Sequence, residues 1–210
     1  MDSYKTTFKT WNKIASIYEN KFMDVNLYND TYSIFCNLIT KPKPTIFEIG
    51  CGPGNITKYL LLQKPNFKIK AIDVAPNMVK LAKANNPAAK FKIMDCRKIN
   101  TITTKFDAIM CGFCMPYLSK TDCIKLIKDC ACLLNTNGLF YFSTIKGNYN
   151  KSGFKAGSSG DACYVYYYPQ KFFEEVLKQN NFKVIELIKK AYQNTSATIE
   201  THLIFIVQKK

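Results

Sequence analysis

The first forty residues carry apolar side chains in a pattern that predicts two amphipathic helices. Apolar positions recur at helical spacing over residues 8–23, including Phe8, Trp11 and Phe22, and again over residues 25–39. Pro42 and Pro44 end the second helix, because proline lacks an amide donor and restricts the residue before it. Residues 1–43 are therefore expected to form an N-terminal helical cap.

Residues 44–210 are expected to form one α/β core. Short apolar runs predict strands at 45–49, 67–73, 90–94, 107–112 and 138–143, and amphipathic stretches predict helices at 54–64, 77–85 and 119–134. Strands that alternate with helices favour a parallel sheet with helices on both faces. Because the crossovers in such sheets are right-handed, the sheet is expected to be doubly wound.

The last third of the chain departs from this alternation. Residues 147–160 are rich in Gly, Ser, Asn and Lys and predict a long mobile loop, within a lid or insert at 146–168 whose edge we expect at 158–161. A helix is predicted at 170–180, followed by strands at 182–189 and 199–207. No helical segment separates these two strands, so they are expected to pair as an antiparallel hairpin.

The net charge raises the question of an anionic partner. Lys and Arg total 30 against 15 Asp and Glu, a formal charge of +15, and such a charge suits nucleic acid. However, Arg97 is the only arginine and the lysines are spread along the chain, whereas phosphate and guanine are best held by the planar arginine fork. We favour a lysine-biased surface, with nucleic-acid binding as the alternative.

Hydropathy and cysteine content bear on the compartment. No uncharged apolar run approaches the ~18 residues of a membrane-spanning helix, and residues 1–20 lack the apolar core of a secretory signal. The 9 cysteines are odd in number and most lie in apolar runs, so we expect reduced thiols in a cytoplasmic protein. Cys111 and Cys114 form a lone Cys-x-x-Cys pair and His202 is the only histidine, so no metal site is expected.

A glycine-rich turn joins the first predicted core strand to its helix. Glycines at positions 50, 52 and 54 let a ligand approach the backbone and the positive helix N-terminus. In an open α/β sheet, ligands bind in this crevice. The spacing differs from the G-x-G-x-x-G fingerprint of dinucleotide sites and from the Walker pattern, so nicotinamide redox chemistry and nucleotide triphosphate hydrolysis are disfavoured.

Acidic residues follow the next two predicted strands. Asp73 ends the second strand, where a carboxylate can accept hydrogen bonds from both hydroxyls of a ribose. Asp95 ends the third strand and can accept a hydrogen bond from an exocyclic adenine amine, with Val74 and Met78 as apolar cover for the ring. Either aspartate could instead cap a helix or a loop.

Together these motifs resemble those of the class I S-adenosylmethionine-dependent methyltransferases. The resemblance rests on residues 48–54, 73–78, 94–96, 106–112 and 138–142 and on the closing hairpin, and it covers roughly residues 11–208. It implies a Rossmann-like, doubly wound, seven-stranded sheet in the order 3-2-1-4-5-7-6, numbered along the chain, with strand seven antiparallel. It also implies S-adenosylmethionine as the cofactor.

The resemblance further implies which residues hold the cofactor. The methionine end of the cofactor would lie along Gly50–Gly54, which Glu48 precedes in the sequence. Asp73 would bind the ribose and Asp95 would lie near the adenine amine. The other cofactor contacts implied are Tyr18 closing over the cofactor, Cys51 in the turn, Val74 and Met78 on the adenine ring, Cys96 and Arg97 at the adenine edge, and Cys111 and Phe113 beside the sulfonium. For Tyr18, packing within the helical stripe is the alternative.

Aromatic residues are the candidate substrate contacts. They are Tyr117 after the fourth core strand and, in the insert, Tyr149, Phe154, Tyr164, Tyr166 and Tyr168. Such a set favours an apolar or aromatic acceptor, or a cation held against aromatic faces, although residues 164–168 could simply pack on the sheet. The Asn/Asp-Pro-Pro-Tyr signature of amino-group methylation is absent after the fourth core strand, which favours the small-molecule branches.

The expected reaction is an in-line displacement that depends on positioning the nucleophile and excluding water. The sequence offers no clear base, and His202, in the last predicted strand, is interpreted as structural. A methyltransferase acting on an O or N atom of a small molecule is the leading hypothesis. The alternatives are an RNA or protein methyltransferase and a non-catalytic protein that binds S-adenosylmethionine.

Overall fold

A seven-stranded sheet forms the centre of the molecule. The computed structural model describes residues 2–157, 160–193 and 198–210. The strands are β1 (Thr45–Ile49), β2 (Lys68–Asp73), β3 (Lys90–Ile93), β4 (Phe106–Cys111), β5 (Leu134–Ile145), β8 (Phe182–Gln193) and β9 (Ile199–Lys209). Their order is β3-β2-β1-β4-β5-β9-β8, and β9 runs antiparallel to both of its neighbours. The predicted order and the antiparallel seventh strand are confirmed.

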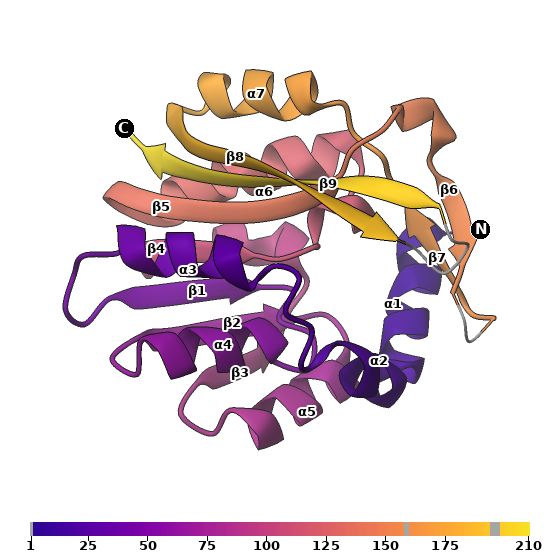
Figure 1. Ribbon diagram of the computed structural model, residues 1–210, viewed down its shortest axis with the longest axis horizontal. Helices are drawn as coiled ribbons and strands as arrows, with labels where there is room; N and C mark the ends of the chain where they lie inside the picture. Colours follow the sequence, from indigo (N-terminus) through magenta and orange to yellow (C-terminus); the bar gives the residue numbers. More distant parts are fainter. Residues whose placement is uncertain (1, 158–159, 194–197) are drawn as a thin grey trace.

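Helices cover both faces of this sheet, as expected for a doubly wound fold (Figure 1). On one face lie α3 (Asn29–Leu38), α4 (Asn55–Gln63) and α5 (Pro76–Asn85), and on the other lie α6 (Lys120–Leu133) and α7 (Gln170–Gln179). Three short 3-10 helices complete the set: η1 (Cys96–Thr101), η2 (Met115–Tyr117) and η3 (Tyr149–Lys151). None of the helices in the described part is long and apolar enough to span a bilayer.

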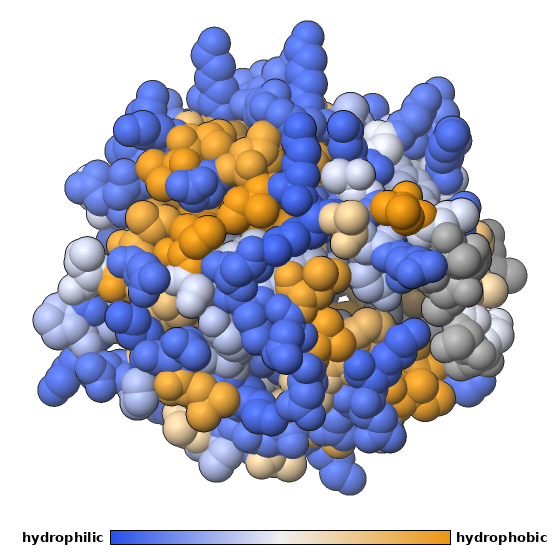
Figure 2. Space-filling view, viewed as in Figure 1, coloured by the Kyte–Doolittle hydropathy of each residue, from blue (hydrophilic) through white to orange (hydrophobic). Residues whose placement is uncertain are grey.

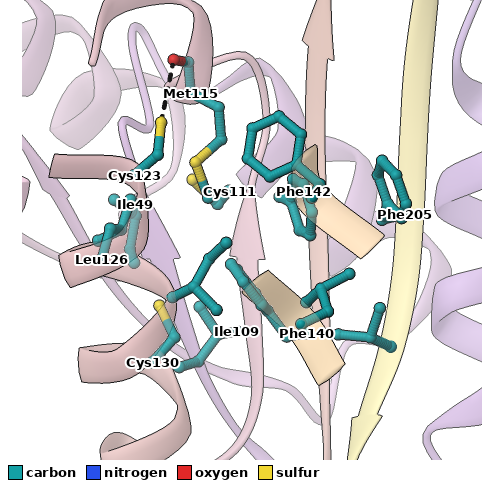
Figure 3. Close-up of a cluster of buried hydrophobic side chains, with 14 of the residues drawn as sticks. Ile49, Ile109, Cys111, Met115, Cys123, Leu126, Cys130, Phe140, Phe142 and Phe205 are labelled. Carbon is teal, nitrogen blue, oxygen red and sulfur yellow. Dashed lines mark hydrogen bonds between the residues drawn. The ribbon is translucent and has the colours of Figure 1, made fainter. Parts of the chain in front are cut away.

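The core between α6 and the centre of the sheet is packed with aromatic and sulfur-containing side chains (Figure 3). The rings of Phe142 on β5 and Phe205 on β9 stack with centroids 4.9 Å apart. From α6, Cys123 donates through Sγ to the Met115 carbonyl, 3.7 Å away. Each fully buried ring of this kind stabilises the fold by ~1.5–3 kcal/mol, so this packing holds the tips of β4 and β5 in place.

The N-terminal segment forms two helices where the sequence predicts one over residues 8–23. These are α1 (Ser3–Lys13) and α2 (Ala15–Phe22), separated at Ile14, whose φ of −93° and ψ of 12° leave the helical region. The apolar stripe continues across the break, which is why periodicity alone does not reveal it. Both helices lie beyond the carboxyl ends of the parallel strands (Figure 1).

The insert after β5 contains an ordered hairpin where a mobile loop was predicted. Strands β6 (Gly153–Ala156) and β7 (Ala162–Val165) pair antiparallel, and Phe154 packs against Tyr164 across the hairpin with ring centroids 5.1 Å apart. Helix α1 anchors the hairpin, because Tyr164 N donates to Thr7 Oγ1 (3.0 Å) and Thr10 Oγ1 donates to the Ala162 carbonyl (2.8 Å). Positions 158 and 159 of the expected lid edge lie outside the described residues.

Candidate functional site

The turn between β1 and α4 adopts a backbone that only glycine takes without strain. Gly50, Gly52 and Gly54 have φ values of +69°, +54° and +87°. A Cβ at Gly54 would lie 2.3 Å from Asn86 Nδ2, so this position excludes a side chain on steric grounds as well. The amides of Gly50 and Cys51 both donate to the Ile72 carbonyl, at 2.8 and 3.0 Å, which fixes the turn against β2.

Asp73 sits at the tip of β2 beside this turn. Its Oδ2 accepts a hydrogen bond from Gly52 N and its Oδ1 accepts one from Ala75 N, each 2.9 Å long. Burial raises the pKa of the Asp73 carboxyl, whereas these backbone donors lower it. A carboxylate offers about four acceptor positions. Two therefore remain for a ligand with paired hydroxyls, such as a ribose.

Asp95, at the N-cap of η1, is tied to the only arginine. Arg97 donates to it from the backbone (2.9 Å to Oδ1) and from its guanidinium, whose Nη2 lies 2.5 Å from Oδ2. Burial would raise the pKa of the Asp95 carboxyl, but these hydrogen bonds outweigh it and hold that pKa below its usual value. The guanidinium also lies 4.0 Å from the centroid of the Tyr4 ring on α1. Asp95 is thus an ionised acceptor with its geometry already set.

Glu48, the acidic residue of the glycine motif, lies beneath the turn. Its side chain is 1% exposed and accepts a hydrogen bond at Oε2 from Thr57 Oγ1 on α4. Burial raises the pKa of Glu48 to about 8 despite the Thr57 hydrogen bond. Oε1 has no hydrogen-bond partner among the described residues. The carboxyl is therefore neutral at pH 7 and ties β1 to α4.

A cavity opens over these strand tips. It encloses about 780 Å³, counting the part open to solvent. Nine predicted cofactor contacts and one predicted substrate contact line it: Tyr18, Gly50, Gly52, Asp73, Val74, Met78, Asp95, Cys96, Phe113 and Tyr117. A turn with three glycines, a helix N-terminus and two carboxylates at adjacent strand tips fit an adenosyl ligand with a charged amino-acid end.

The other predicted contacts lie outside the cavity wall. These are Glu48, Cys51, Gly54, Arg97 and Cys111, none of which lines the cavity. The insert tyrosines pack with one another instead. Ring centroids are 4.7 Å apart between Tyr164 and Tyr166 and 5.7 Å apart between Tyr149 and Tyr166, and Tyr168 is fully buried and donates to the Leu118 carbonyl. Phe154 is 42% exposed on the hairpin.

Seven residues of the cavity wall were not predicted. They are Thr7, Phe8 and Trp11 on α1 together with Met94, Gly112, Cys114 and Leu118. The Trp11 ring contacts the rings of Tyr18 (5.4 Å) and Tyr117 (5.2 Å), and its indole N–H is buried without a hydrogen-bond partner in the described chain. The spacing of Trp11 within its helix matches that of an ordinary core residue. The one signal in the sequence was the presence of a tryptophan in an otherwise polar N-terminal segment.

Thiols gather at one wall of this cavity. Cys96 and Cys114 both line it, with their Sγ atoms 3.7 Å apart. The hydrogen bond with the Cys111 thiol and burial raise the pKa of Cys114, outweighing the hydrogen bond with Cys96 that lowers it, so the sulfur stays protonated. Within residues 2–157, 160–193 and 198–210, no group of three or more His, Cys, Asp and Glu side chains is arranged to hold a metal ion.

Comparisons with known proteins agree with this geometry. Residues 46–138 match a family described as a methyltransferase domain. A putative methyltransferase 235L of Invertebrate iridescent virus 6 is 30% identical over 113 residues, covering 54% of this chain and 41% of the viral protein. A malonyl-[acyl-carrier protein] O-methyltransferase 1 of Ilyobacter polytropus is 28% identical over 143 residues, covering 67% of this chain and 52% of that protein. The chain thus spans about half the length of these curated relatives.

A solved structure extends the likeness over nearly the whole fold. The 1,6-didemethyltoxoflavin-N1-methyltransferase of Burkholderia thailandensis, with bound 1,6-didemethyltoxoflavin and S-adenosylhomocysteine, superposes with a TM-score of 0.73. The two chains are 15% identical, and the match covers 98% of this chain and 88% of the other. At that identity the likeness establishes the fold, including the N-terminal helices and the final hairpin.

Proposed function

We propose that this chain is a class I S-adenosylmethionine-dependent methyltransferase that methylates an O or N atom of a small molecule. The observation that carries the proposal is the cavity at three adjacent strand tips, where the glycine turn, Asp73 and Asp95 meet. The free thiols of all nine cysteines favour a reducing compartment, so we propose the cytoplasm.

In this proposal the chain's own residues bind, orient and exclude water. The Gly50–Gly54 turn and the N-terminus of α4 hold the amino-acid end of the cofactor, Asp73 holds the ribose hydroxyls, and Asp95 holds the adenine amine. Phe8, Trp11 and Tyr18 cover the cavity from above and keep water out. S-adenosylmethionine, when bound, supplies a methyl group already activated by its sulfonium.

The first test is binding. Calorimetry should detect S-adenosylmethionine and S-adenosylhomocysteine, and Asp73→Asn should weaken both by ~1–3 kcal/mol, because it removes charge-assisted hydrogen bonds to the ribose. Asp24→Asn is a matched control, since the Asp24 side chain is 86% exposed and its ion pair among the described residues is with Lys58. Unchanged affinity in Asp73→Asn would contradict the ribose assignment. Transfer of labelled methyl into a fractionated metabolite extract then tests catalysis.

A basic sheet face keeps the RNA methyltransferase as a second candidate. Lys70 pairs in register with Lys90, and Ile72 with Lys92, so Lys70, Lys90 and Lys92 point to the same face of β2 and β3. They line a groove there, and none forms an ion pair with the described residues. Figure 2 shows how widely hydrophilic side chains cover one face of the molecule. RNA affinity that falls steeply with salt, and falls again on removal of these lysines, would favour this candidate.

A further inference from the structure

One crossover between the parallel strands lacks an α-helix. Helix α4 joins β1 to β2, α5 joins β2 to β3 and α6 joins β4 to β5, whereas β3 leads to β4 through η1, a 3-10 helix of 6 residues. Sheets of this kind are normally covered by helices on both faces. Helix α5 packs against β2 and β3 on one face. The other face of these two strands therefore receives no full helix from its own crossover.

A groove occupies this face of the sheet. It encloses about 580 Å³, counting the part open to solvent. Its floor contains Ile72 and the rings of Phe47 and Phe106, which stack with centroids 4.8 Å apart; all three side chains are buried. Met94 and Ile102, both partly buried, line it as well. The short crossover thus leaves an apolar groove at the edge of the sheet.

Three lysines border the groove. Lys70 on β2 pairs in register with Lys90 on β3, and Lys92 follows two positions along β3. Residues two apart on a strand point to one face, and neighbouring strands lie ~4.8 Å apart, so the three side chains leave the backbone within a small area. Lys70 Nζ lies 5.9 Å from the centroid of the Phe106 ring. The methylene stems thus cover apolar surface while the side chains remain exposed to solvent.

The three ammonium groups have no counter-charge from the protein. None of them forms an ion pair within the part of the chain that the structure describes. None of the described residues that line the groove is acidic. Like charges directly opposite each other on neighbouring strands are destabilising. An anion with an apolar body would relieve this repulsion and also cover the apolar lining.

The composition of the groove favours a small amphiphile over nucleic acid. Single-stranded RNA stacks its bases on accessible aromatic rings, but Phe47 and Phe106 are only 2% and 1% exposed beneath the lysine stems. No arginine lines the groove to hold phosphate in a planar fork, and Thr104 is its only uncharged polar residue in the described chain. An alkyl chain needs no polar partners and gains from contact with Met94, Ile102 and the lysine methylenes.

We propose that this groove is a second ligand site, separate from the cofactor cavity, and that it binds an amphipathic organic anion, namely an unbranched alkyl chain that ends in one carboxylate. The chain lies along the apolar lining, and the carboxylate lies among the ammonium groups of Lys70, Lys90 and Lys92. The inference goes beyond the proposed function, because none of these lysines lines the cofactor cavity.

Met94 gives this site a direct reporter. Of the described residues, it alone lines both the groove and the cofactor cavity, and its amide donates to the Asp73 carbonyl at 2.9 Å. A ligand in the groove therefore changes the surroundings of the Met94 methyl group. The chain has 6 methionines, so the methyl signals are few, and the loss of one signal in Met94→Leu assigns it.

The test follows this signal by NMR in the full chain, labelled at its methionine methyl groups and titrated with octanoate in the absence of cofactor. We expect octanoate to shift the Met94 signal saturably. Hexanoate should bind about tenfold more weakly, since each buried methylene strengthens binding about fourfold. Octanamide, which keeps the chain length without the charge, should bind at least about fivefold more weakly than octanoate.

The variant Lys70→Gln/Lys90→Gln/Lys92→Gln locates the ligand. It should weaken octanoate binding about tenfold and remove the preference of octanoate over octanamide, because the carboxylate loses its three cations. All three positions are exposed, so the variant should fold like the wild type. A shift caused by octanoate in the cofactor cavity would survive this change, since these lysines lie outside it.

A matched control removes the same charge elsewhere. Lys171→Gln/Lys178→Gln/Lys183→Gln changes three exposed lysines of α7 and β8 and should leave octanoate binding unchanged. Equal binding of octanoate and octanamide, a normal octanoate affinity in the groove variant, or an equal loss of affinity in both variants overturns the inference. So does an RNA oligonucleotide that shifts the Met94 signal where octanoate does not, a result that would assign the groove to RNA.

Discussion

Glu48 offers a direct test of how the glycine turn is supported, through the substitution Glu48→Gln. The carboxyl is 1% exposed, and its pKa rises from an ordinary 4.5 to about 8 because burial penalises the charged form. In the unfolded chain the same group ionises near its ordinary value. Glutamine keeps the shape and the acceptor for Thr57 but cannot ionise.

The expected effect follows from proton linkage. Between pH 4.5 and 8 the native state holds one more proton at Glu48 than the unfolded state does. The contribution of this group to stability is therefore complete below pH 4.5 and is lost as pH rises toward 8, at ~1.4 kcal/mol per pH unit. From pH 5.5 to 7.5, the free energy of unfolding of the wild type should therefore fall by about 2 to 3 kcal/mol relative to that of Glu48→Gln.

Urea unfolding of both proteins at pH 5.5, 6.5 and 7.5 measures this difference. The two free energies of unfolding should diverge with pH, with Glu48→Gln the more stable at pH 7.5. Glu186→Gln, at an exposed position on β8, is the control and should show no pH-dependent difference. A wild-type to Glu48→Gln difference that stays constant over this range would refute the neutral buried carboxyl.

Three further substitutions test the surroundings of the site. Gly54→Ala should destabilise the fold by ~1–3 kcal/mol in urea unfolding, because φ is +87° and the new Cβ would meet Asn86 Nδ2 at 2.3 Å. Arg97→Lys should weaken S-adenosylhomocysteine binding severalfold in calorimetry, since lysine cannot hold both Asp95 oxygens in a planar fork. Tyr141→Phe should cost ~0.5–1.5 kcal/mol of stability and leave cofactor affinity unchanged, because it removes a buried 2.9 Å hydrogen bond with Thr31 away from the cavity. An unaltered urea midpoint in Gly54→Ala, an unaltered S-adenosylhomocysteine affinity in Arg97→Lys, or an unaltered stability in Tyr141→Phe would contradict the corresponding expectation.

Local sequence patterns were sufficient for the strands themselves and for the positions of the glycine turn, Asp73 and Asp95, whereas the strand order was implied by the resemblance to the methyltransferases. Runs of apolar residues bounded by Gly, Pro and Asn identify strands, and alternation with helices specifies the parallel arrangement. Glycine at 50, 52 and 54 is a local requirement of backbone geometry, so it is visible without knowledge of distant contacts. The residues at strand tips then meet automatically, because parallel strands end at one edge of the sheet.

The tertiary structure decided which side chains close the site. A stripe containing Phe8 and Trp11 has the same periodicity whether it packs in a core or covers a cavity, and the break at Ile14 turns it over the strand tips. The partnership of Tyr28 with His202 joins residues 174 positions apart. Such contacts depend on where the antiparallel β9 returns to the sheet, and no local pattern encodes that meeting. The turn and its acids thus follow from short-range chemistry, whereas the aromatic wall exists only once the distant segments are packed together.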